Sequence, residues 1–343
     1  MPDNLDRYRR QVRFAPFGEA GQKKLAEARV LVCGCGALGS VVADFLVRAG
    51  VGFVRIVDRD FVERDNLHRQ VLFTEADALA QLPKAVAAAA RLAAVNSEVR
   101  IEPVVADVNW GNLERLAADV GLIVDGTDNF ETRYLLNDFS VHAGVPWIFA
   151  GCVGAEGQTF AIRPGESACL SCFLPEPPPA SSQATCETAG VLAPIVGVIA
   201  SYQAMEALKF CSGNIAAVNP QLMVFDMWHN QVRSIQMAAS RRPDCPTCGE
   251  RKFPWLTGDR GSAATRLCGR NSVQISPTDF EPVDLGVLAE RLSQLGPVTL
   301  NSFLVRVAVG EFLLTVFADG RTIVGGTDDV ALARTVHAKY IGA

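Results

Sequence analysis

The stretch that decides the fold is RVLVCGCGALGS, residues 29–40, in which a short apolar run leads directly into Gly-x-Gly-x-x-Gly. Apolar residues then recur at positions 41, 42, 45, 46 and 49, the spacing of one helical face. The glycines Gly34, Gly36 and Gly39 permit a tight turn and let the backbone approach a phosphate closely, and the helix start offers unpaired N–H groups. The alternative is a tight strand–helix turn that binds nothing.

Outward from this loop, strand and helix patterns alternate. We expect strands at 29–33, 53–57, 121–124 and 145–150, and helices at 39–49 and 83–95. Because apolar strands that alternate with helices form parallel sheets covered on both faces, the sequence predicts a doubly wound, Rossmann-like α/β fold.

The pattern changes after Gly151. Strands expected at 158–163, 222–226 and 231–237 predict an antiparallel extension of the sheet, and a long apolar helix is expected at 193–211. The polar Ser201 and Glu206 within that helix favour a buried helix over a membrane span. We expect four parts: an N-terminal arm (1–27), a nucleotide-binding domain (28–250), a linker (251–265) and a small C-terminal α+β domain (266–343). In the last part the pattern predicts a strand at 272–275, helices at 285–295 and 329–341, and strands between them.

Composition excludes several classes of protein. Among 343 residues, 49% are hydrophobic and 20% are charged, the balance of a globular chain with a large core. The net charge of −5 argues against a nucleic-acid binder. The charged start carries no apolar signal core, so we expect a cytoplasmic protein without a membrane span, whose ten cysteines are not disulfides.

Charged residues behind the glycine loop distinguish between nucleotides. Asp58 follows the loop by about 20 residues, where a carboxylate can bind ribose hydroxyls of either NAD or ATP. Arg69 and Lys84 suit a triphosphate, and Asp128 at the end of the next strand suits Mg²⁺. Each of these charges taken alone could be a solvated surface residue, but their shared position on one sheet edge favours ATP.

The cysteines fall into groups. Two C-x-x-C pairs, Cys169/Cys172 and Cys245/Cys248, predict a closed structural Zn²⁺ site, with a redox pair as the alternative. Cys186 precedes a helix, which can lower a thiol pKa, so we expect a functional thiol there rather than a plain loop cysteine. Cys268 opens the C-terminal domain, and we favour packing over reactivity for it.

With these motifs in place, residues 5 to 250 resemble the ThiF/MoeB/HesA family, which also contains the ubiquitin-activating enzymes. The resemblance rests on the order and spacing of several motifs: RYRRQ (7–11), Gly34–Gly39, DRD (58–60), NLHRQ (66–70), Pro83-Lys84, TDN (127–129) and TCETAGV (185–191). It implies a homodimeric adenylyltransferase that uses ATP and Mg²⁺ and carries zinc.

The resemblance also implies roles for individual residues. Asp58 would hold the ribose, Arg69 and Lys84 the phosphates, and Asp128 would face Mg²⁺ and the incoming carboxylate. Arg10 would reach into the partner subunit's site. The candidate catalytic residues are Arg10, Arg69, Lys84, Asp128 and Cys186; the candidate nucleotide-binding residues are Gly34, Gly36, Gly39, Asp58, Asp60, Asn66, Arg69, Gln70, Lys84, Asp128 and Asn129.

The expected function is ATP-dependent adenylation of the C-terminal glycine carboxylate of a ubiquitin-like sulfur-carrier protein of the ThiS or MoaD type. A cysteine desulfurase or a rhodanese would supply the sulfur. An NAD-dependent oxidoreductase is the alternative; it shares the glycine loop and Asp58 but leaves Arg69 and Lys84 unexplained. A non-catalytic scaffold is a third possibility. The C-terminal domain could dock the carrier, accept sulfur through Cys268 or support the dimer.

Overall fold

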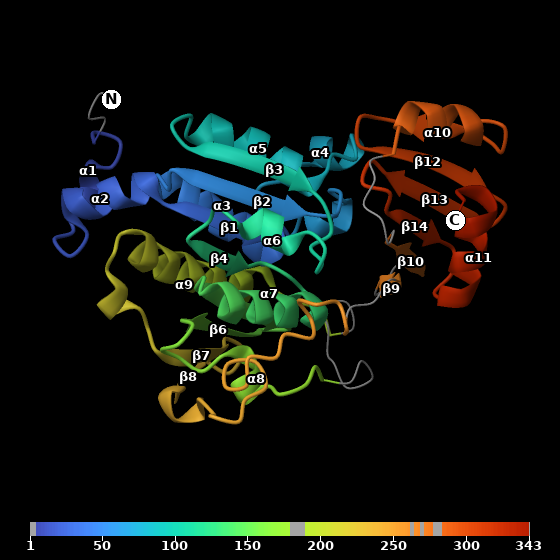
Figure 1. The fold of residues 1–343 in the computed structure, drawn as a ribbon. Helices are drawn as coiled ribbons and strands as arrows, with labels where there is room; N and C mark the ends of the chain where they lie inside the picture. The colour runs from blue at the N-terminus through green and yellow to red at the C-terminus, as the bar shows by residue number, and fades with distance from the viewer. Residues whose placement is uncertain (1–4, 179–188, 261–263, 268–270, 277–282, 343) are drawn as a thin grey trace. The chain divides into compact units, whose positions relative to one another are not determined.

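The computed structural model describes residues 5–178, 189–260, 264–267, 271–276 and 283–342. The chain divides into two compact units, Met1–Arg260 and Gly261–Ala343. Figure 1 shows the two units, each built around a sheet of its own. Within the described ranges, every helix is too short or too polar to cross a bilayer.

The N-terminal unit contains an eight-stranded sheet in the order β3-β2-β1-β4-β5-β6-β7-β8. The first five strands of that order are parallel, and β5 to β8 pair antiparallel. This arrangement confirms the predicted doubly wound sheet with its antiparallel extension. The strands are β1 (Arg29–Cys33), β2 (Phe53–Asp58), β3 (Arg100–Val105), β4 (Leu122–Asp125), β5 (Trp147–Val153), β6 (Glu156–Ile162), β7 (Gln221–Asp226) and β8 (Gln231–Gln236).

Helices cover both faces of this sheet (Figure 1). One layer holds α3 (Ala37–Ala49), α5 (Lys84–Val95) and α9 (Ala193–Cys211); the other holds α6 (Leu113–Ala117), α7 (Phe130–Ala143) and α8 (Leu170–Phe173). Strand β1 contributes Val30 and Val32 to the first layer's core and Leu31 and Cys33 to the second. Burial on both faces explains its unbroken apolar run. The remaining helices of this unit include α1 (Arg9–Val12), α2 (Gly18–Glu27) and α4 (Glu75–Leu79).

Several elements of this unit were not predicted from the sequence, and two of them, β3 and α7, have a physical reason. Strand β3 lies at the sheet edge, is only partly buried and contains Pro103, so its apolar signal is weak. Helix α7 buries polar residues together with apolar ones, among them Arg133, Asn137 and Asp138, which removes the apolar stripe that marks a surface helix.

The C-terminal unit is an antiparallel sheet in the order β11-β12-β13-β14-β10-β9, with two helices. Buried residues of α10 and α11 pack with those of β10, β12, β13 and β14 in one core. The tight turn between β13 and β14 contains Gly320 at φ +84°, in keeping with the Asp-Gly hairpin signal. The bounds are β9 (Ala264–Leu267), β10 (Ser272–Ile275), α10 (Leu285–Leu292), β11 (Val298–Leu300), β12 (Leu304–Val309), β13 (Phe312–Phe317), β14 (Thr322–Gly325) and α11 (Val330–Tyr340).

The expected linker, 251–265, differs from what the structure shows. Trp255 stacks on Tyr134 of α7 with ring centroids 5.4 Å apart, and Phe253 and Leu256 pack on the same core. Residues up to Arg260 therefore belong to the first unit. Strand β9 already begins at Ala264, because its backbone pairs with β10.

Candidate nucleotide and metal sites

Two glycines of the loop are required by the fold itself. Gly34 has φ +88°, and a Cβ there would lie 2.7 Å from the Gly126 carbonyl oxygen. A Cβ at Gly39 would lie 1.9 Å from the carbonyl oxygen of Gly34. The loop after β1 thus packs backbone to backbone against the loop after β4, and no larger side chain fits between them.

Gly36 is different, because the fold leaves its surroundings open. A Cβ at Gly36 would meet a single atom of the described residues within 4 Å, Gln70 Nε2 at 3.9 Å. Gln70 and Asn66 are 3% and 2% exposed, yet Gln70 Oε1 and Asn66 Oδ1 accept no hydrogen bond from any residue that the structure describes. Buried acceptors without a donor are costly, so these two amide groups and the open Gly36 fit a bound ligand better than an empty loop.

Asp58 ends β2 beside this loop. Its two oxygens accept hydrogen bonds from Cys35 N (2.5 Å) and Asp60 N (2.7 Å). Burial raises the pKa of Asp58, and the positive charge of Lys84 opposes that rise. The strand register pairs Cys33 with both Val57 and Asp125, so the ends of β2, β1 and β4 lie side by side at one sheet edge. This is the edge at which such sheets bind ligands.

One cation, Lys84, borders the same edge, and a second, Arg69, lies on the segment that carries Asn66 and Gln70. Lys84 is the first residue of α5, its side chain is 5% exposed, and its Nζ lies 3.3 Å from Asp60 Oδ2. Arg69 follows the short helix at Arg64–Asn66 and donates from Nη1 to the carbonyl oxygen of Asp65 at 2.7 Å.

The turn after β4 presents one exposed carboxylate above a buried ion pair. Asp128 is exposed, whereas Asp125 is fully buried and accepts from Thr127 Oγ1 (2.7 Å) and Arg133 Nε (3.3 Å). Burial raises the pKa of Asp125, and Arg133 opposes that rise. Asn129 Oδ1 caps α7 by accepting from Thr132 N at 2.8 Å. The side-chain oxygen of Asn129 is therefore already an acceptor within the protein, which leaves the side-chain Nδ2 group to donate to a ligand.

Arg59 was missed as a candidate site residue. Its Nη1 lies 3.1 Å from Asp107 Oδ1. Burial lowers the pKa of Arg59, but the carboxylates of Asp107, Asp60, Asp128 and Asp58 outweigh burial and raise it. The sequence indicates Arg59 only through its position in the Asp-Arg-Asp motif. Its ion-pair partner Asp107 lies on a different loop, and the two residues meet only in the folded chain.

Arg10 lies on the far side of the unit from this edge. It is exposed on α1, and the neighbouring Gln11 donates from Nε2 to the carbonyl oxygen of Ala49, the last residue of α3, at 3.0 Å. The glycine loop is at the other end of α3. Thirteen helical residues span about 20 Å, which is beyond the reach of one arginine side chain, so Arg10 does not meet the nucleotide edge of its own subunit.

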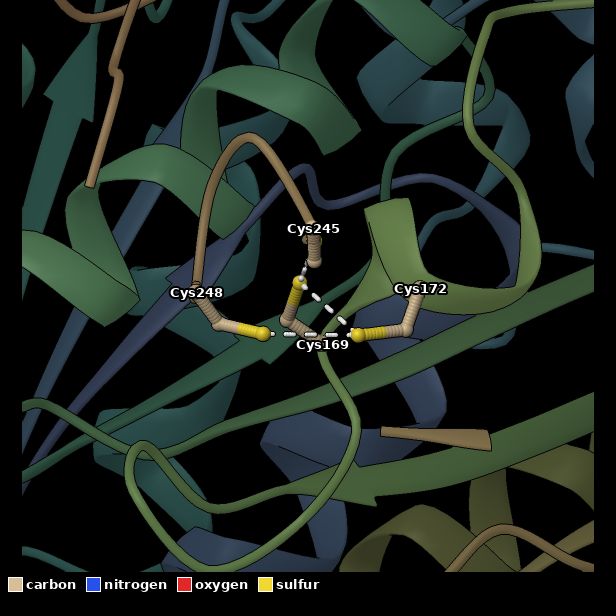
Figure 2. Close-up of side chains that lie close together, drawn as sticks. All are labelled: Cys169, Cys172, Cys245 and Cys248. Atoms are coloured by element: carbon tan, nitrogen blue, oxygen red, sulfur yellow. Dashed lines mark hydrogen bonds between the residues drawn. The ribbon is translucent and has the colours of Figure 1, made fainter. Parts of the chain in front are cut away.

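The four cysteines of the two pairs converge, as Figure 2 shows. Their sulfur atoms all lie within 4.8 Å of one another. The Sγ–Sγ distances are 3.8 Å for Cys169–Cys172, 3.6 Å for Cys169–Cys245 and 3.3 Å for Cys172–Cys248. Sulfurs at 2.3 Å from a tetrahedral zinc stand about 3.8 Å apart, so this donor set fits Zn²⁺ with little movement. The hydrogen bond from Cys169 lowers the pKa of Cys172, which favours the thiolate that a metal needs.

Three of the remaining cysteines show no such activation. Cys33, Cys35 and Cys211 are free thiols whose pKa values burial raises, that of Cys211 to about 12. Thiols of this kind are poor nucleophiles at neutral pH. Cys186 and Cys268, the two predicted candidates for sulfur chemistry, lie outside the described residues.

The glycine loop, the carboxylate edge and the four-cysteine cluster define the class of protein: residues 8–247 match the ThiF family, and the chain belongs to it. The sulfur carrier protein ThiS adenylyltransferase of Bacillus subtilis is 43% identical over 337 residues, which cover 98% of this chain and 99% of that protein. The sulfur carrier protein adenylyltransferase of Thermus thermophilus is 38% identical, covering 72% of this chain and 92% of its own.

Among solved structures, Escherichia coli MccB in complex with AMPCPP and MccA is similar with a TM-score of 0.63 and 26% identity. The match covers 72% of this chain and 75% of MccB. The similarity to the Bacillus protein extends over both units of this chain, so the C-terminal domain is included in it.

Proposed function

We propose that this protein uses ATP to adenylate the C-terminal glycine carboxylate of a small ubiquitin-like sulfur-carrier protein, forming an acyl-adenylate and pyrophosphate. The observation that carries the proposal is the open space at Gly36 next to Gln70, together with the buried amide oxygens of Gln70 and Asn66 that accept no hydrogen bond from the described residues and with the buried Lys84 at the same sheet edge. The substrate class comes from the Bacillus relative, which is named for acting on ThiS and is similar over the whole chain.

The reaction brings two anions together, which is the main barrier that the site must lower. Lys84 and Arg69 offset the charge of the phosphates, and the loop N–H groups at the start of α3 face the same region. Asp128, an exposed carboxylate at the strand edge, would hold Mg²⁺, which supplies further neutralisation of the triphosphate when bound. Asp58, whose carboxylate is held by two backbone N–H groups, would bind the ribose hydroxyls.

Two copies of the chain form the complete site. Arg10 is too far from its own nucleotide edge, so it serves the partner subunit. A groove between α3 and α9 is lined by apolar residues that are unusually exposed, with Phe45 at 40%, Val71 at 63% and Met205 at 55%. An apolar face of this kind is costly to leave in water, and we assign it to the contact between the two copies.

Zinc bound by Cys169, Cys172, Cys245 and Cys248 has a structural role here. Four protein thiolates leave no open position for a substrate. The ion would tie the segment before residue 179 to the end of the first unit.

The test is pyrophosphate–ATP exchange that depends on a carrier ending in Gly-Gly. We expect exchange with a ThiS- or MoaD-type carrier, none without it, and loss of exchange in Asp128→Ala. Absence of exchange with every such carrier of the host would contradict the proposal. Titration with NADH tests the oxidoreductase alternative, because binding of a nicotinamide would appear as a change in its fluorescence.

Sulfur transfer is a separate step of the proposal. A cysteine desulfurase or a rhodanese would convert the Cys186 thiol to a persulfide, whose outer sulfur would attack the acyl-adenylate and displace AMP. A second thiol would then reduce the resulting acyl disulfide and release the carrier thiocarboxylate. Cys186→Ser should leave pyrophosphate exchange intact and reduce thiocarboxylate formation, measured by the mass of the carrier. Unchanged thiocarboxylate formation would exclude Cys186.

A further inference from the structure

The two cysteine pairs are also joined by contacts that contain no sulfur. Each pair has a hydroxyl at its third position, Ser171 in Cys-Leu-Ser-Cys and Thr247 in Cys-Pro-Thr-Cys. The two hydroxyl oxygens lie 3.0 Å apart, and the residues are 3% and 4% exposed. The loops therefore meet through a buried hydrogen bond as well as through their thiols.

Helix α7 contacts the first pair through Asn137. Asn137 Oδ1 accepts from Leu170 N at 2.8 Å, and Asn137 Nδ2 donates to Ser171 Oγ at 3.2 Å. The asparagine is fully buried, so both polar ends of its amide are used by the loop that carries Cys169 and Cys172.

The next residue of α7, Asp138, contacts the second pair. Asp138 Oδ1 accepts from Thr247 Oγ1 at 3.2 Å, and Oδ2 accepts from Trp255 N at 3.0 Å. Asp138 is also fully buried. Adjacent residues of one helix thus each bind one of the two loops.

The protons can be arranged in one direction only. A carboxylate accepts, so Thr247 must donate its hydroxyl proton to Asp138, and its oxygen is then an acceptor for the hydroxyl of Ser171. Ser171 in turn accepts from the amide of Asn137. This single chain of donors, from Asn137 to Asp138, satisfies every hydroxyl along it.

We propose that Asn137, Asp138, Ser171 and Thr247, here called the α7 clamp, position the two cysteine pairs for the metal and slow its release. The proposal rests on the assignment of Zn²⁺ to the four cysteines. Hydrogen bonds around a metal site restrict the motion of its ligands, and their loss typically reduces metal affinity 10- to 100-fold. Apolar residues could fill the same space without the cost of burying a carboxylate, so mere packing does not account for Asp138.

The experiment compares two substitutions of the same kind in the zinc-loaded full chain. Thr247→Val removes the hydroxyl that joins Ser171 to Asp138. Thr159→Val is the matched control, because Thr159 is 2% exposed and donates one hydrogen bond to the Phe149 carbonyl oxygen, at 2.9 Å, away from the cysteines. Zinc release to a chromogenic chelator is followed over time, and thermal unfolding is recorded for each protein.

We expect Thr247→Val to release zinc at least about 10-fold faster than the wild type, and Thr159→Val to release it at the wild-type rate even if its thermal stability falls. Ser171→Ala, a milder change, should lie between them and serves if Thr247→Val does not fold. Equal release rates for the wild type, Thr247→Val and Ser171→Ala would overturn the clamp alone. A wild type that binds no zinc would overturn the zinc assignment and the clamp together, while pyrophosphate exchange would still test the adenylation.

Discussion

A Cβ atom added at Gly39 would lie 1.9 Å from the carbonyl oxygen of Gly34, whereas one added at Gly36 would meet Gln70 Nε2 at 3.9 Å. The sequence motif gives all three glycines the same role, and only the structure shows that their surroundings differ. Gly34 and Gly39 serve the contact between two loops. Gly36 leaves an open space that no described side chain fills, so it indicates a ligand more strongly than Gly34 or Gly39 does.

Two alanine substitutions should separate these roles. Gly39→Ala should destabilise the fold by several kcal/mol, because backbone must move to admit the methyl group (overpacking typically costs about 1–3 kcal/mol, occasionally more). Gly36→Ala should fold normally and raise the KM for ATP. Thermal unfolding and pyrophosphate exchange measure the two effects. A Gly36→Ala protein with unchanged KM would place the phosphates elsewhere.

The buried thiols give a second prediction at this scale. Burial raises the pKa of Cys33, Cys35 and Cys211, so iodoacetamide at pH 7.5 should label none of the three in the native protein. Peptide mass spectrometry before and after unfolding in guanidinium measures the labelling, with full labelling of unfolded protein as the control. Rapid native labelling of Cys33 or Cys35 would show that the glycine loop opens in solution.

Among the elements, α3 and α9 could be predicted from the sequence and α7 could not. The first two carry continuous apolar faces, and α9 was predicted with its observed bounds, Ala193–Cys211. Helix α7 lies between the sheet and the cysteine loops, so it needs polar side chains inside. Arg59 was missed for a different reason, because Asp107, the carboxylate that it contacts, lies on another segment of the chain.

The cap of α7 can be tested directly. Asn129→Ala removes the hydrogen bond to Thr132 N and should lower the free energy of unfolding by about 1 kcal/mol. Asn129→Asp keeps a capping oxygen and should recover most of that stability. Urea denaturation measures both. If the aspartate protein were as unstable as the alanine protein, the side chain of Asn129 would not act as the cap.

At the scale of the whole molecule, our proposal is that two chains complete each active site, because α1 lies at the end of α3 remote from the glycine loop. Arg10→Ala and Asp128→Ala should each abolish exchange when expressed alone. Co-expressed, they form mixed dimers in which one site has both residues intact, and random pairing should restore about a quarter of the wild-type activity. Activity that stays at background in the mixture would mean that Arg10 acts within its own subunit or not at all.

The sequence predicts the order of the helices and strands better than it predicts the boundary between the two units. Residues 240–262 are rich in proline, glycine and arginine, a composition that is typical of a linker, but Trp255 stacks on Tyr134 of α7 and its neighbours pack on the same core. Local composition cannot report such a contact, because the partner residue lies more than 100 positions earlier in the chain.

The separation of the two cysteine pairs also sets an order of events while the chain is being made. Cys172 leaves the ribosome 76 residues ahead of Cys248. At about 5–20 residues per second, the first pair waits roughly 4–15 seconds for the second. During that interval β7 and β8 are being synthesised, so the full set of thiols exists only after the antiparallel half of the sheet has emerged. The proposed zinc would therefore bind only after Cys248 has emerged, shortly before the end of the first unit at Arg260, and a chain truncated before Cys245 would lack two of the four ligands.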